Sequence, residues 1–218
     1  MRAATSYQRT LAVLAFFTLA AGEFWRNLLG WWGWGAIAGL LLVLATVEIV
    51  RERITPRRLP FWLLVFVGFA ALSTAWSASP AETAIATLTT VATTLGAMFL
   101  ATCLTWEEAL ETLSDALRWV LGLSLLFELV VATVIRRPVL PLWVDYSDLD
   151  TIPRAFYWSR DLLFEGGRIQ GIVGNANILG MLALLGIIVF VLRLVARKGS
   201  PVWGWAWLAA AVAVFALT

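Results

Sequence analysis

The chain has 218 residues, of which 61% are hydrophobic and only 14% are charged. Soluble domains carry about 25% charged residues, and the mean hydropathy here is +0.86, so the composition indicates an integral membrane protein. The basic residues are spread along the chain rather than gathered in a stripe, which excludes a nucleic-acid-binding surface. With no histidine and a single cysteine, Cys103, the chain lacks the commonest metal ligand and cannot form an intramolecular disulfide.

Seven apolar segments approach or exceed the length that predicts a membrane helix, which is about 18 residues. They are residues 8–24, 32–50, 60–77, 82–103, 116–135, 172–193 and 202–218. The first segment follows two arginines as a signal peptide would, but no small-residue cleavage site comes after it, so we expect a transmembrane helix. The predicted fold is therefore all-α, a polytopic transmembrane helical bundle that forms a single domain over residues 1–218.

Basic residues predict the orientation of this bundle. If the chain weaves, ten of them fall on one side: Arg2, Arg9, Arg51, Arg53, Arg57, Arg58, Arg118, Arg193, Arg197 and Lys198. Five of the other six belong to one long loop, and long loops count less in the positive-inside rule. We therefore expect a cytoplasmic N-terminus and an extracytoplasmic loop at residues 136–171.

The stretch TWEEALETLSDALRW, residues 105–119, predicts a short amphipathic helix on the cytoplasmic side. Thr105 is a good N-cap, and Glu107 and Glu108 lie in the first turn, where the helix dipole favours acidic residues. Three leucines at helical spacing share one face. This pattern is typical of an interfacial connector ahead of the fifth apolar segment.

The loop at 136–171 is long enough to suggest a function. Within it, residues 153–164 predict an interfacial helix that starts at a proline and is ended by the pair Gly166-Gly167. Three aspartates, Asp145, Asp148 and Asp150, match a calcium loop only in part, with neither its glycine turn nor its closing glutamate. We expect a solvated acidic turn there and no metal site. We expect the aromatic side chains of the loop to pack or to lie on the membrane surface, with sugar stacking by Trp143 or Trp158 as the alternative.

Arginine guanidinium binds phosphate oxygens in pairs and keeps its charge. Two loop arginines, Arg136 and Arg137, directly follow the fifth segment and are expected to reach lipid headgroups. The remaining candidates for a phosphate or diphosphate are Arg154, Arg160 and Arg168.

Arg168 is the strongest of these candidates because glycines beside it allow backbone to approach a ligand closely. Asn175 and Asn177 follow at the mouth of an apolar run, where polar side chains should face protein or water. We expect Arg168 and Asn177 to line one cavity. Two acids in apolar segments differ in their expected partners: Glu48 has arginines nearby in sequence, whereas Glu128 has none and is a candidate site-lining residue.

Two stretches carry a family resemblance. GGRIQGIVGNANILG, residues 166–180, contains R-x-x-G-x-x-x-N-x-N-x-x-[AG], and LSTAWSASPAETA, residues 72–84, contains most of L-S-x-x-W-S-x-x-P-x-x-A. Both resemble signatures of the O-antigen ligase and O-antigen polymerase superfamily. The second pattern departs from the family at Thr83, where alanine is usual, and the first at Ala176, where proline is usual.

The resemblance implies a polytopic glycosyltransferase at the outer face of a bacterial cytoplasmic (inner) membrane. It implies transfer of a glycan from an undecaprenyl diphosphate carrier to a glycan or lipid acceptor hydroxyl, among membrane lipids, with no cofactor. Arg168 matches the arginine that contacts the diphosphate, Asn175 and Asn177 match the motif amides, and Arg154 and Arg160 remain possible substrate contacts. Trp76 and Ser77 match the other signature, with packing as the expected role.

Family members also carry a catalytic histidine in a later outer loop, and this chain has none. The resemblance therefore implies that these residues are the N-terminal portion of a longer enzyme and are inactive alone. Two other functions fit the composition: a transporter or flippase for a lipid-linked glycan, which predicts paired breaks in its helices, and a non-catalytic membrane subunit.

Overall fold

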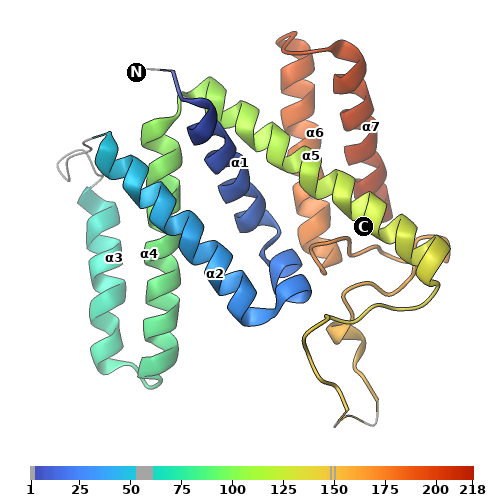
Figure 1. Cartoon of the computed structure of the whole chain (residues 1–218), viewed down its shortest axis with the longest axis horizontal. Helices are drawn as coiled ribbons and strands as arrows, with labels where there is room; N and C mark the ends of the chain where they lie inside the picture. Colours follow the sequence, from blue (N-terminus) through green and yellow to red (C-terminus); the bar gives the residue numbers. More distant parts are fainter. Residues whose placement is uncertain (1–2, 53–60, 148, 150) are drawn as a thin grey trace. The chain divides into compact units, whose positions relative to one another are not determined.

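The structure is a computed structural model that describes residues 3–52, 61–147, 149 and 151–218. Within these residues the fold is all-α, as predicted, and contains no β-strand (Figure 1). The helices are α1 Ser6–Ala20, α2 Gly22–Arg51, α3 Phe61–Ser73, α4 Pro80–Cys103, α5 Trp106–Val130, α6 Ala176–Val195 and α7 Pro201–Leu217. Short turns are η2 Thr74–Trp76, η3 Val131–Ile135 and η4 Arg154–Phe156.

Among the described residues, four helices are long and apolar enough to cross a membrane. These are α2, α4, α5 with its continuation through η3, and α6. Two further apolar helices, α3 with η2 and α7, are shorter, and α1 has 15 residues, whereas a helix needs about 20 to span the hydrocarbon core. An all-α membrane protein is therefore confirmed, and seven membrane passes stay a prediction.

Two helix boundaries differ from the sequence expectation. The amphipathic stretch from residue 105 is the beginning of α5 itself, because no helix breaker separates it from the apolar segment that follows. Its start is as predicted and is a capping box: Thr105 Oγ1 accepts from the Glu108 N–H at 3.3 Å, and Glu108 Oε2 accepts from the Thr105 N–H at 2.9 Å. Helix α2 begins ten residues earlier than its apolar run and is broken at Gly30, where φ is 73°.

The interfacial helix predicted over 153–164 is wrong. Only η4 forms there, and residues 157–165 are irregular. Val139 and Ser159 form an isolated antiparallel bridge, in which the Val139 N–H donates to the Ser159 carbonyl at 2.8 Å. This pairing holds the backbone extended, and Asp161 then takes a positive φ of 60°, so the helix cannot continue.

The described contacts divide the chain into two compact units. One comprises Met1–Ala12 with Gly39–Ala109, and the other comprises Val13–Ala38 with Leu110–Thr218. That the whole chain forms a single domain stays a prediction.

The first unit contains the α3–α4 hairpin and a small core around Phe99, which is fully buried. Buried polar groups tie its helices together. The Gln8 side chain donates to Glu48 at 2.9 Å, and Arg9 pairs with Glu108 at 2.9 Å. Glu48 also pairs with Arg51 at 2.9 Å, which confirms the expectation of a partner near it in sequence.

The second unit contains the larger core and the long loop. Helices α6 and α7 lie side by side as an antiparallel hairpin (Figure 1). Glycines let α5 approach this hairpin closely: a Cβ at Gly186 would lie 2.9 Å from Leu121, and one at Gly122 would lie 3.1 Å from Trp207. The fully buried side chains of Leu117, Leu121, Leu179, Val214 and Phe190 complete this core.

Candidate functional site

The break in α2 seats the beginning of the long loop. A helix that stops leaves carbonyls without intrahelical partners, and the positive φ at Gly30 creates such a stop within α2. The Leu142 N–H donates to the Asn27 carbonyl at 2.9 Å, and the Trp143 indole N–H donates to the Leu28 carbonyl at 2.6 Å. The loop therefore satisfies the carbonyls that the break exposes.

Trp158 fixes the returning half of the loop. Its side chain is 5% exposed, and its ring lies 4.7 Å from Phe127 and 6.3 Å from Phe24. The indole N–H donates to the Ile172 carbonyl at 3.0 Å. A buried ring offers no face to a sugar, so Trp158 packs and does not stack on substrate. Trp143, by contrast, stays 69% exposed.

Glu128 clamps the segment that follows Arg168. This carboxylate is 1% exposed. Its Oε1 accepts from the N–H groups of Gln170 at 2.9 Å and Gly171 at 2.7 Å, and its Oε2 accepts from the Ser159 hydroxyl at 2.8 Å. Glu128 thus joins α5 to both ends of the last part of the loop, residues 159–171. In the described part of the chain it forms no ion pair, so hydrogen bonds alone compensate its burial.

Gly171 is required at its position by space as well as by conformation. Its φ is +58°, and a Cβ there would lie 2.5 Å from the Ser124 hydroxyl and 2.9 Å from Leu179. The Ser124 hydroxyl accepts from the Ile172 N–H at 3.3 Å. Gly174 also has a positive φ, of +69°, but the nearest atom to its Cβ would be 3.4 Å away, on Asn27. The motif glycine, Gly171, therefore packs against α5, whereas Gly174, which stands at a variable position of the motif, only turns the chain.

The motif asparagines begin α6. Asn175 is the N-cap, and its Oδ1 accepts from the N–H groups of Asn177 at 2.9 Å and Ile178 at 3.3 Å. Asn177 is exposed, and its Oδ1 accepts from Nη2 of Arg168 at 2.7 Å. The structure therefore brings Arg168 and Asn177 together. Ala176, where the signature that this stretch resembles has proline, is the first residue of the helix, a position that proline also suits.

Arg168 is exposed at the N-terminal end of α6 and the C-terminal end of α7. Besides the bond to Asn177, its Nε donates to the Thr218 carbonyl, and the adjacent Ile169 N–H donates to the Leu217 carbonyl at 2.9 Å. These contacts use the Nε and Nη2 edge of the guanidinium. Among the residues that the structure describes, no group bonds Nη1, so this nitrogen can donate to a ligand.

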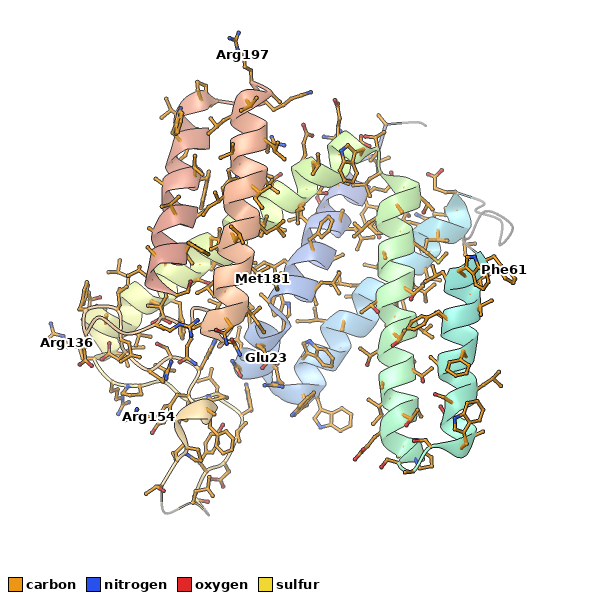
Figure 2. The ribbon with its side chains drawn as sticks, turned by 180° about the vertical axis from the view of Figure 1, so that it is seen from behind. Glu23, Phe61, Arg136, Arg154, Met181 and Arg197 are labelled. Atoms are coloured by element: carbon orange, nitrogen blue, oxygen red, sulfur yellow. The ribbon has the colours of Figure 1, made fainter. Side chains whose placement is uncertain are left out.

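The other loop arginines divide into two groups. Arg160 is joined to the segment that Glu128 holds. Its Nε donates to the side-chain oxygen of Gln170 at 3.1 Å, and Gln170 is two residues after Arg168 in the sequence. Arg154 lies on η4, toward the tip of the loop, and Arg136 follows the end of α5 (Figure 2). The described contacts do not join Arg154 to Arg168, Asn175 or Asn177. Of the predicted site residues, Arg168 and Asn177 are therefore in direct contact. Asn175 caps the helix beside them, and Arg160 contacts the neighbouring Gln170.

Of the three aspartates predicted to form a solvated acidic turn, the structure describes only Asp145. Asp148 and Asp150 lie outside the described residues. Asp145 accepts from the Ser147 N–H at 2.9 Å, and this bond lowers the pKa of its carboxyl. The pKa of the neighbouring Tyr146 phenol is raised, because burial raises it by more than the positive charge of Arg26 lowers it. In the ranges that can be described, no three acidic, cysteine or histidine side chains are grouped to hold a metal.

The second signature belongs to the first unit and closes the α3–α4 hairpin. The hydroxyls of Ser77 and Thr83 lie 2.6 Å apart, and Ser77 Oγ also accepts from the Ser79 N–H at 3.1 Å. Thr83, where the signature that this stretch resembles has alanine, therefore contributes to the turn. Trp76 stays 63% exposed, and its ring centre lies 6.0 Å from that of Phe69; its expected packing role stays a prediction.

No known protein family, curated protein or solved structure matches this chain. Its function must therefore be inferred from its residues and from their arrangement. Sequence reasoning missed Ser124, Ser159 and Gln170, which hold the loop around Glu128. Serine and glutamine carry no local signal of such a role, but the lone acid in an apolar segment marks where partners should be sought.

Proposed function

We propose that the chain takes part in transferring a glycan from an undecaprenyl diphosphate carrier to an acceptor hydroxyl, as the signatures at 72–84 and 166–180 imply. The observation that carries the proposal is the exposed Arg168 guanidinium, held by Asn177 at the first turn of α6. The proposed location is a bacterial cytoplasmic membrane, with the N-terminus inside and the long loop outside.

The chemistry needs a cation at the leaving group. The acceptor oxygen bonds to the anomeric carbon, the bond from that carbon to the diphosphate oxygen breaks, and the diphosphate leaves with the electron pair. A pre-placed guanidinium stabilises the charge that develops on this oxygen without a metal. Arg168 suits this role because Asn177 and the end of α7 fix one edge of it, which leaves Nη1 directed elsewhere.

The surrounding contacts support preorganisation. Glu128, Gly171 and Asn175 each fix backbone within a few residues of Arg168, and a site on fixed backbone spends less free energy on ordering itself. The proton of the acceptor hydroxyl needs a base. By resemblance this base is a histidine, which these 218 residues do not contain, so the proposed contribution of this chain is binding and stabilisation of the diphosphate.

A second candidate, a transporter or flippase for a lipid-linked glycan, is favoured by one observation. Transporters place substrate between helices that are interrupted at corresponding depths. Helix α2 is broken at Gly30, and the turn at 171–174 precedes α6 within the same unit. The turn approaches α2 near its break, since a Cβ at Gly174 would lie 3.4 Å from Asn27. The same Arg168 would then bind the diphosphate during passage.

Proteoliposomes containing the protein as produced from its natural gene separate the two functions. They are given an undecaprenyl-diphosphate-linked oligosaccharide and a glycan acceptor, and products are identified by mass spectrometry. Transfer predicts an acceptor heavier by one glycan and free undecaprenyl diphosphate in equal amount. A change of leaflet by the intact donor, with no new acceptor mass, would instead establish transport and contradict transfer.

A further inference from the structure

A second candidate site lies at the other end of the α6–α7 hairpin. A cavity of about 350 Å³ opens there, where Figure 2 shows Arg197 at the turn between the two helices and the long loop with Arg154 at the opposite end. Its polar lining comes from Arg118, Arg193, Lys198 and Ser200, and its apolar wall includes Trp203 and Trp207. These residues belong to a single compact unit.

Local structure explains how this cavity forms. Gly199, with φ +86°, turns the chain between the helices, and Pro201 begins α7. A Cβ at Gly204 would lie 2.5 Å from Leu194, so α7 closes tightly on α6 beside the turn. Trp203 and Trp207 are four residues apart and therefore share one face of α7. The cavity is the space between this face, the last turn of α6 and α5.

The charge of the lining is of one sign. Three cationic side chains contribute to it, and none of the described lining residues is acidic. Arg118 pairs with Asp115, whose carboxylate lies 2.9 Å from Nη1. The Nε atoms of Arg118 and Arg193 are buried, and within the described residues neither finds an acceptor. Buried N–H donors are normally paired, so two such donors beside one cavity point to an anionic acceptor.

The start of α7 adds to this preference. Ser200 is the N-cap, but its side chain makes no capping hydrogen bond. The first N–H groups of a helix and its dipole favour an anion. The dipole of α6 favours a cation in its last turn, which is enough to explain Arg193. It does not explain Arg118, which lies midway along α5.

We infer that this cavity binds a phosphate group, and that the group belongs to the headgroup of an anionic phospholipid. Guanidinium and ammonium donors suit phosphate oxygens, and the cavity has room for the glycerol that carries the phosphate. The tryptophans and Phe190 give the acyl chains an apolar path along the hairpin. Positive residues at this end predict the cytoplasmic side, where basic pockets between membrane helices bind anionic headgroups. This inference does not depend on the proposed glycan transfer.

Titration calorimetry of the delipidated full chain in detergent tests the inference. The probe is dioctanoyl phosphatidylglycerol, and dioctanoyl phosphatidylcholine is the zwitterionic comparison. Arg193→Gln and Lys198→Gln remove lining charges, whereas Arg197→Gln removes an exposed charge from the same turn and is the matched control. We expect each lining variant to weaken phosphatidylglycerol binding about tenfold, the scale of one charge-assisted hydrogen bond, and the control to bind as wild type does.

Two further comparisons complete the test. Inorganic phosphate and glycerol 3-phosphate identify the source of the phosphate: competition at similar concentrations indicates a soluble phosphate ligand, and its absence indicates a lipid headgroup. If Arg193→Gln does not fold, as judged by circular dichroism, Lys198→Gln on the exposed turn decides the matter. Equal binding of phosphatidylcholine, unchanged binding by the lining variants, or an equal loss in Arg197→Gln would overturn the inference.

Discussion

Glu128 offers the sharpest test of how the site is held. If it acts as a clamp, its oxygens matter as hydrogen-bond acceptors and its charge matters little. Replacing it with alanine removes the acceptor for the Gln170 and Gly171 N–H groups and for the Ser159 hydroxyl. Each buried donor left unpaired costs about 1–3 kcal/mol, so Glu128→Ala should lower the free energy of unfolding by at least about 3 kcal/mol.

The variant Glu128→Gln keeps the shape of the side chain, and glutamine can still make all three hydrogen bonds. Its carbonyl oxygen can accept from both backbone N–H groups, and its amide can donate to the Ser159 oxygen, because a hydroxyl serves as donor or acceptor. Neutral hydrogen bonds are about half as strong as charge-assisted ones. Glu128→Gln should therefore cost only about 1–2 kcal/mol, and glycan transfer should persist.

Two measurements follow these variants. Unfolding in mixed micelles of mild detergent and dodecyl sulfate gives the free energy of unfolding, and the rate of proteolytic cleavage within residues 136–175 reports local order. Loop cleavage should accelerate strongly in Glu128→Ala and slightly in Glu128→Gln. The clamp is refuted if alanine changes neither quantity. A glutamine variant that is stable but inactive would instead assign the carboxylate to the chemistry.

The remaining predictions concern the turn and the helix start. Gly171→Ala should destabilise the protein by more than Gly174→Ala: both have a positive φ, which costs about 1–2 kcal/mol, but only the first would also clash with Ser124. Equal melting temperatures for the two variants would contradict this. Asn175→Ala should cost about 1 kcal/mol through loss of the α6 N-cap, measured by unfolding in mixed micelles, and substitution by serine should restore most of it.

Much of the fold could be predicted because membrane helices leave a strong compositional signal, a long run of apolar residues. The apolar runs located the helices, and Thr105 with Glu108 identified the start of α5. The break at Gly30 was not evident, because several glycines lie in this region and only one adopts a positive φ. The loop helix was predicted wrongly because its boundaries resembled caps, whereas the pairing of Val139 with Ser159 is long-range in sequence.

The contact between Arg168 and Asn177 could be predicted from the sequence, but the hydrogen bonds of Glu128 that hold the loop around it could not. Arg168 and Asn177 are close in sequence, and the nearby helix start brings them into contact. Glu128 was recognised as an acid without a local partner, but its partners come from residues 31 to 43 positions away. A sequence pattern at short spacing cannot show such contacts, and a structure is needed to distinguish a clamp from a site-lining acid.

The most direct test of the central claim is the rate of glycan transfer by Arg168→Ala, with Arg137→Ala as control. Arg137 is also exposed in the loop but follows the end of α5. Loss of a contact to the leaving group should raise the barrier by about 2–4 kcal/mol, a decrease in rate of about 30- to 1000-fold, with unchanged free energy of unfolding and a control rate near wild type. Wild-type transfer by Arg168→Ala, or an equal loss in Arg137→Ala, would contradict the account.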